Sequence, residues 1–114
     1  MTIKKVAEVL EGSVVTGADD QREVGAVVAS DLMSDVLLFD CDDMLLLTSL
    51  ASEQSIRTAN IVGAMGVVVH NGKPLPEAMC KVAETLGIPL VSCRLAKYES
   101  CVRLHAALEA EKNA

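Results

Sequence analysis

The chain has 114 residues, of which 51% are hydrophobic, yet only Phe39 and Tyr98 are aromatic. Its 16 acidic and 10 basic residues give a formal net charge of −6, and beyond Lys4-Lys5 no basic cluster could bind nucleic-acid phosphates. So few rings argue against base stacking, sugar platforms and aromatic cages, and we expect one domain over residues 1–114 with an aliphatic core.

Two features of the sequence predict a cytoplasmic protein that does not cross a membrane. No stretch approaches the roughly 18 uninterrupted apolar residues of a membrane-spanning helix, and the amphipathic N-terminal segment has no cleavage site. The cysteines form no CxxC pair and have no histidine at metal-binding spacing; they are Cys41, Cys80, Cys93 and Cys101. We therefore expect free thiols without a metal or cofactor, with redox or metal chemistry as the alternative.

The first third of the chain predicts two short helices and two strands. Apolar residues at helical spacing predict a helix over residues 3–10, with Thr2 as its N-cap and Gly12 as its stop. "SVVT" predicts a brief strand, and the uncharged "VGAVVAS" predicts a buried one. Ser30 or Asp31 can cap a helix in the "SDLMSDVLLF" segment that follows.

From Met44 onward, strands alternate with helices. "MLLLTS", "GVVVH" and "IPLVS" predict strands, and the helices between them begin near Ser52 and Pro76, the second ending at Gly87. The last helix is expected from about residue 96 to residue 108, followed by a frayed tail over residues 109–114. This alternation predicts an α/β three-layer sandwich, with a mostly parallel sheet of about five strands and helices on both faces.

Polar residues follow the predicted strands. In an open parallel sheet, ligands bind beyond the carboxyl ends of the strands. The candidate ligand-binding residues at that edge are Ser30, Asp31, Ser34, Thr48, Asn71, Gly72, Lys73 and Ser92. Their hydroxyl, amide and charged groups suit a small anionic or phosphorylated ligand, although Ser, Thr and Asp before a helix also serve as caps without any ligand.

Arg22 is a further candidate for anion binding. It stands in the acidic loop "GADDQRE", where an ion pair with Asp19 or Asp20 is the favoured interpretation. Contact with an anionic ligand is the alternative.

The sequence contains no complete catalytic motif. "HNGKP" lacks the first glycine and the last hydroxyl of a phosphate-binding loop, so it predicts a tight turn in which Asn71 and Gly72 adopt positive φ. His70 has no acid or nucleophile with a defined place beside it. "DCDD" is charged enough for a cation but lacks the glycine turn of a calcium loop, which favours a solvated turn.

Four stretches, distributed between residues 2 and 104, carry a resemblance to a known family. They are "TIKKVAEVLEGSVVTG", "REVGAVVASDLMSDVL", "GVVVHNGKP" and "ETLGIPLVSCRLAKYESCVRL". The chain resembles the DRTGG domain, in its small stand-alone bacterial form. The most specific match is Arg22-Glu23-Val24 followed by Ser30-Asp31-Leu32-x-Ser34-Asp35. The naming residues depart from the family, with Gln21 in place of Asp and Gly25-Ala26-Val27 in place of Thr-Gly-Gly.

The resemblance implies a non-enzymatic module with a fold similar to the N-terminal domains of HPr kinases and Mur ligases. Such domains occur alone, beside CBS pairs and within phosphate acetyltransferases, and in Mur ligases that kind of domain holds a nucleotide-sugar. The small stand-alone forms are often encoded near iron-only hydrogenase and NADH-linked redox components.

Three functional hypotheses follow from the sequence. The first is a regulatory module that senses a small anionic or nucleotide-like ligand and forms a homodimer, because an aliphatic surplus often covers an interface around a two-fold axis. The second is an interaction module that docks on a redox enzyme or a kinase without a ligand. The third is an enzyme, such as a phosphotransferase, that uses His70 or Ser92, and the missing phosphate loop argues against it.

Overall fold

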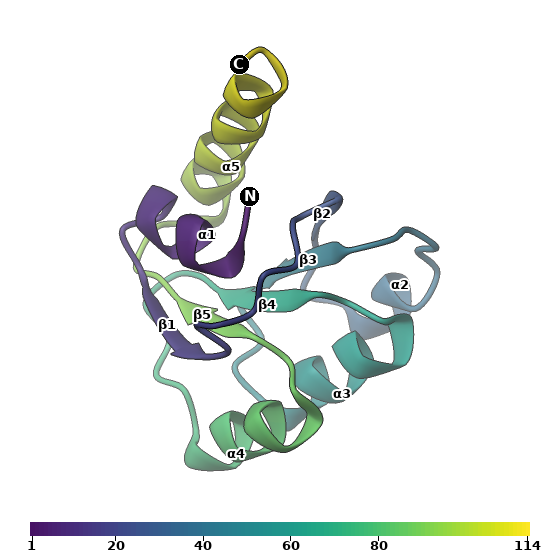
Figure 1. Cartoon of the computed structure of the whole chain (residues 1–114). Coiled ribbons are helices and arrows are strands. Elements are labelled where there is room, and N and C mark those ends of the chain that lie inside the picture. The colour runs from purple at the N-terminus through teal and green to yellow at the C-terminus, as the bar shows by residue number, and fades with distance from the viewer.

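The computed structural model describes all residues, 1–114, and confirms the α/β fold with a mostly parallel sheet. The elements, in chain order, are α1 (Ile3–Val9), β1 (Ser13–Thr16), β2 (Ala26–Ala29), α2 (Met33–Val36), β3 (Met44–Thr48), α3 (Glu53–Val62), β4 (Gly66–Val69), α4 (Glu77–Leu86), β5 (Leu90–Ser92) and α5 (Lys97–Lys112). The five strands lie in the order β1-β5-β4-β3-β2, and only β1 runs antiparallel to its neighbour (Figure 1).

Two apolar clusters, one on each face of the sheet, hold the three layers together. Side chains alternate along a strand, so the consecutive leucines of β3 divide between the faces. Leu46 packs with α2, α3 and α4, whereas Leu45 and Leu47 pack with α1 and α5. Figure 1 shows these two helix layers below and above the sheet.

Several helix ends follow the sequence signals. Thr2 caps α1, and its hydroxyl oxygen accepts a hydrogen bond from the Lys5 amide at 3.4 Å. Gly63 and Gly87 end α3 and α4 with φ of 70° and 69°, a left-handed conformation that glycine adopts without steric cost. After α1 the left-handed residue is Glu11, with φ of 53°, and not Gly12.

The predicted cap of the second helix is wrong. α2 is a single turn whose N-cap is Leu32, and no side chain caps it. The Ser30 hydroxyl accepts a hydrogen bond from the Leu32 amide at 3.2 Å, one residue short of the helix, and the Asp31 carboxylate bonds to β3 and the residue after it.

Two further expectations differ from the structure. β2 was predicted as a buried strand, but it lies at an edge of the sheet and only Val28 in it is buried. The last helix continues to Lys112, through the residues expected to form a frayed tail. The Met1 ammonium group lies 3.2 Å from the Glu111 carboxylate and 3.1 Å from that of Glu23, which anchors this end of α5 to the start of the chain.

No helix combines the length and apolar character that crossing a membrane would require.

Candidate functional site

The carboxyl ends of the four parallel strands meet at one edge of the sheet, as the strand order requires. This edge carries most of the predicted ligand-binding residues: Ser30 and Asp31 after β2, Thr48 at the end of β3, Asn71, Gly72 and Lys73 after β4, and Ser92 at the end of β5. Ser34 lies in α2, exposed and without a side-chain hydrogen bond.

Arg22 lies elsewhere. It precedes β2, so it belongs to the opposite edge, where the parallel strands begin. Its guanidinium donates hydrogen bonds to Asp20, from Nη2 to Oδ2 at 2.8 Å and from Nε to both carboxylate oxygens at 3.2 Å, and these bonds lower the pKa of the Asp20 carboxyl. The favoured interpretation of Arg22 as an ion-pair partner is therefore confirmed for Asp20.

Asp31 connects three elements at the carboxyl edge. Its Oδ1 accepts hydrogen bonds from the Ser49 amide at 2.7 Å and from the Thr48 hydroxyl at 3.2 Å, and its Oδ2 lies 3.2 Å from Lys97 Nζ. The Ser49 amide and, to a smaller extent, Lys97 lower the pKa of Asp31 to about 2. We call this arrangement the Asp31 bridge; it joins the ends of β2 and β3 to the start of α5, so its carboxylate serves the fold.

Replacing Asp31 by asparagine is expected to lower the free energy of unfolding at pH 7 by about 1 kcal/mol, a modest loss because solvent screens this half-exposed carboxylate. The folded-state pKa of Asp31 lies below its ordinary value of 3.8. Its contribution is therefore complete above that value and is lost as the pH falls towards 2. Urea unfolding of both proteins from pH 2 to 7 should show the difference closing at the acid end. Asp35→Asn, on exposed α2, is the control, and a difference that persists at pH 2 would contradict the bridge.

His70 is fully buried at the end of β4 and has 0% exposure. Neither ring nitrogen has a hydrogen-bond partner, and burial lowers the pKa of the imidazole although Asn71 and Asp31 act in the opposite direction. A general base has to reach its substrate, and the His70 side chain has no exposed surface through which it could do so. This position argues against the phosphotransferase hypothesis that uses His70.

The predicted turn after β4 has the expected backbone. Asn71 and Gly72 have φ of 68° and 63°, and their amides donate hydrogen bonds to the carbonyl oxygens of Leu95 and Cys93 at 2.8 and 2.9 Å. The turn is therefore fastened to the segment after β5, and its two amides are already engaged. Lys73 is exposed beside it and forms no ion pair.

A polar hollow of about 480 Å³ lies at the carboxyl edge, where β1 begins beside the end of β5. We call it the rim hollow. Its lining residues are Leu10, Glu11, Gly12, Ser13, Ser92, Cys93, Arg94 and Leu95. Ser13 is the ladder partner of Ser92, so the antiparallel pairing of β1 with β5 places two hydroxyl-bearing residues at this edge.

The rim hollow contains an arginine and two backbone amides that have no partner within the chain. Arg94 is exposed and forms no ion pair, and the amides of Arg94 and Leu95 donate no hydrogen bond within the chain. The one acidic side chain in the lining is Glu11, and its carboxylate lies 2.7 Å from Arg103 Nη1, a guanidinium that also pairs with Glu99. A guanidinium, two free amides and two hydroxyls are donor groups that bind phosphate and carboxylate oxygens.

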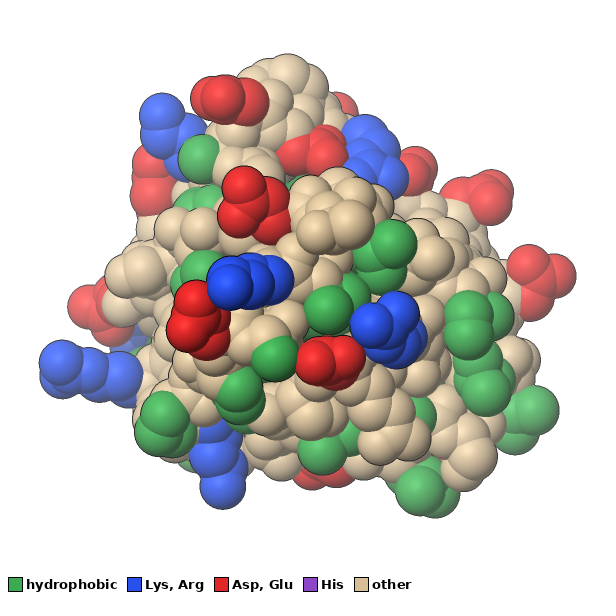
Figure 2. All heavy atoms as spheres, turned by 90° about the horizontal axis from the view of Figure 1, so that it is seen from below, with side chains coloured by type: hydrophobic (Ala, Val, Ile, Leu, Met, Phe, Trp, Pro, Cys, Tyr) green, Lys and Arg blue, Asp and Glu red, His purple; other side chains and the backbone are tan.

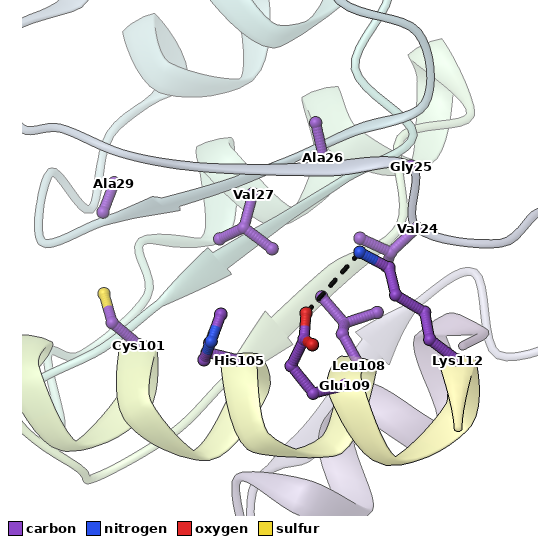
Figure 3. Close-up of a pocket in the computed structure, with 10 residues that line it drawn as sticks. All are labelled: Val24, Gly25, Ala26, Val27, Ala29, Cys101, His105, Leu108, Glu109 and Lys112. Atoms are coloured by element: carbon purple, nitrogen blue, oxygen red, sulfur yellow. Dashed lines mark ion pairs between the residues drawn. The ribbon is translucent and has the colours of Figure 1, made fainter. Parts of the chain in front are cut away.

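A second hollow, which we call the β2 groove, lies between β2 and α5 on the opposite side of the molecule from β1 (Figure 3). Its volume is about 460 Å³. Val27 points from the strand towards α5, and Leu108 and His105 point back from the helix (Figure 3). This groove is more apolar than the rim hollow, and it contains none of the predicted ligand-binding residues.

The four cysteines are free thiols, and no three His, Cys, Asp or Glu side chains lie close enough together to hold a metal ion. Cys93 is buried, with its sulfur 3.7 Å from the Ser100 hydroxyl.

Sequence reasoning found Ser92 but missed its neighbours in the rim hollow. Arg94 follows the predicted strand closely and could have been found as a cation just beyond a carboxyl end. Ser13 could not, because its place depends on the antiparallel position of β1 next to β5, which is far away in the sequence.

Neither a scan against protein-family models nor a search of curated proteins finds a match for this chain. The resemblance to the DRTGG domain therefore stays a prediction, and the functional argument rests on the geometry.

Proposed function

We propose that this protein is a non-catalytic, cytoplasmic sensing module that binds a small anionic ligand in the rim hollow. The observation that carries the proposal is Arg94, an exposed guanidinium in a polar hollow without a carboxylate partner. Ligand pockets occupy roughly 300–1,000 Å³, and the rim hollow, at about 480 Å³, falls within that range.

The location supports the same proposal. The rim hollow lies at the carboxyl edge of the sheet, where open α/β sheets bind their ligands. The Asp31 bridge and the fastened turn after β4 engage their groups in internal hydrogen bonds, whereas the Arg94 guanidinium and the amides of Arg94 and Leu95 at the β5 end have no partner within the chain. A phosphate or pyrophosphate group, as in a nucleotide or phosphorylated metabolite, fits those donors. The DRTGG resemblance implies a similar ligand class, through the nucleotide-sugar sites of Mur ligases.

The proposal is tested by titrating inorganic pyrophosphate, ADP and a nucleotide-sugar into the protein and measuring heat of binding and thermal shift. Arg94→Gln should weaken binding of the best probe about tenfold or more, because charge-assisted hydrogen bonds are lost. Arg57→Gln is the control, since Arg57 is also exposed but pairs with Glu53 on α3. No binding of any anion at millimolar concentration, or equal losses in both variants, would overturn the proposal.

The β2 groove favours a second candidate function. An interaction module needs an exposed apolar surface, and this groove provides one without charged ligand-binding groups at its centre. In that case a redox enzyme or a kinase would be the partner, as the sequence predicts for the alternative. For this candidate, we expect the Arg94→Gln variant to bind the partner as well as the wild-type protein does. Neither the variant nor the wild-type protein should then bind an anion.

A further inference from the structure

β2 leaves a row of backbone groups without partners. The Ala26 amide donates a hydrogen bond to the carbonyl oxygen of Asp43, just before β3, at 3.4 Å. The Ser30 amide donates one to the carbonyl oxygen of Leu47, in β3, at 3.0 Å. Backbone groups alternate in direction along a strand, so the N–H and C=O groups of Val27 and Ala29 point away from β3. Each chain therefore presents two donors and two acceptors at this edge.

The two edges of the sheet differ in how they are protected. β1, the other edge strand, has an irregular register between Val14 and Thr16, and such bulges discourage pairing with a foreign strand. β2 reads Ala-Val-Val-Ala, with no proline, charge or bulge, and its register with β3 is regular. An unprotected apolar edge is a ready site for strand addition.

The helix layer above β2 is also incomplete. Three helices cover one face of the sheet, but only α1 and α5 cover the other, and α5 leans away from the sheet towards its C-terminus (Figure 1). The β2 groove is the space that this arrangement leaves between β2 and α5. Glu109 and Lys112 at its end pair with each other at 3.5 Å, so the groove has little net charge.

The opposite layer exposes apolar side chains on the same side of the molecule. α2 joins β2 to β3 and packs against α3, which makes it the outermost helix at the β2 end. On either side of α2, the exposed large apolar residues are Leu32 before it and Leu37, Leu38 and Phe39 after it, and Leu38 is 82% exposed. Figure 2 shows hydrophobic side chains gathered at the right-hand margin, the side on which Figure 1 places α2.

We infer that a second copy of this chain covers this side, through antiparallel pairing of the two β2 strands. With a two-fold axis at Val28, perpendicular to the sheet, Val27 of each copy lies opposite Ala29 of the other. All four outward groups of each chain then form hydrogen bonds, and the two sheets become one. Because this axis is perpendicular to the sheet, each face of one copy continues into the same face of the other. The α2 helices of the two copies therefore approach each other on one face, and the two α5 helices do so on the other.

A second copy fits this side better than a short peptide strand does. A peptide would complete the edge and fill the β2 groove, but it would leave Leu38 and Phe39 exposed in the other layer. A second copy carries the same three features in the same order, so one contact covers all of them. This inference is independent of the rim hollow, which lies at the β1 and β5 end of the sheet.

Sedimentation equilibrium of the full chain over a range of concentrations tests the interface. The wild-type protein should be a dimer at tens of micromolar. Ala29→Pro removes an outward donor without touching the bonds to β3, and Leu38→Asp places a charge in the other layer; each should raise the dimer dissociation constant about tenfold or more. Ile61→Asp, on α3 and similarly exposed at 73%, should leave it unchanged.

Circular dichroism of each variant shows whether it is folded. The two substitutions lie in different parts of the chain, so if one variant fails to fold, the other still tests the interface. A wild-type protein that stays monomeric up to millimolar concentration would overturn the inference, as would a dimer that both variants retain. A monomer that binds an apolar strand peptide would also overturn it, and would assign the edge to a foreign strand.

Discussion

Replacing Gly12 by alanine is expected to lower the free energy of unfolding by about 3 kcal/mol, at the upper end of the range for overpacking. A Cβ at this position would collide with the Ser92 carbonyl oxygen and would lie 3.0 Å from Cys93 Cβ. The oxygen belongs to the backbone of β5 and cannot rotate away, so β1 would have to move from its partner. Gly12 is thus required by a close approach of two strands, and its φ is not in the left-handed region.

Gly66→Ala is the matched comparison, because the new Cβ would also meet an atom at short range, 2.6 Å from Ile3 Cδ1. That atom is the end of a flexible side chain, which can change rotamer, and alanine in a strand reduces the conformational freedom of the unfolded chain. We expect a change within about 1 kcal/mol for this variant. Urea unfolding of both variants measures the contrast, and equal losses would show that the approach of β1 to β5 is not rigid.

Gly12 also connects stability with the proposed ligand site. It lines the rim hollow between Glu11 and Ser13, so moving β1 would separate the two serines that the ladder brings together. Gly12→Ala should therefore weaken binding of the anionic probe as well as the fold, whereas Gly66→Ala should leave binding unchanged.

The order of elements from Met44 onward could be predicted because it depends on local patterns. Apolar runs of strand length alternate with helical spacing, and Gly87 provides a stop whose left-handed conformation the structure confirms. The shared carboxyl edge then follows from parallel strands, without knowledge of any single contact.

The edge position of β2 could not be predicted in the same way. "VGAVVAS" has the composition of a buried parallel strand, and whether a second strand lies beside it depends on the order of the sheet. The same ambiguity affected Asp31. An aspartate before a helix is typical of an N-cap. Here the Asp31 carboxylate instead accepts a hydrogen bond at 2.7 Å from the amide of Ser49, just after β3, and it does not cap α2.

Acidification below about pH 6.5 is expected to destabilise the protein through His70. A histidine in the unfolded chain takes up a proton near its ordinary pKa of 6.5, whereas burial lowers the pKa of His70 in the folded state. The unfolded state therefore binds more protons as the pH falls below 6.5, and the free energy of unfolding falls by up to about 1.4 kcal/mol per pH unit until the folded-state pKa is reached. Above pH 7 the imidazole is mostly neutral in both states, so His70 contributes almost no slope there.

His70→Leu should abolish this slope below pH 6.5. It should also leave stability at pH 7.5 unchanged or higher, because two buried ring nitrogens without hydrogen-bond partners are removed. His105→Leu is the control, since His105 is the other histidine and is exposed on α5. Urea unfolding at each pH measures the slope, and an NMR titration of the two imidazoles measures the pKa of His70 directly. A slope that survives in His70→Leu but disappears in His105→Leu would assign the acid sensitivity to α5 instead of the buried end of β4.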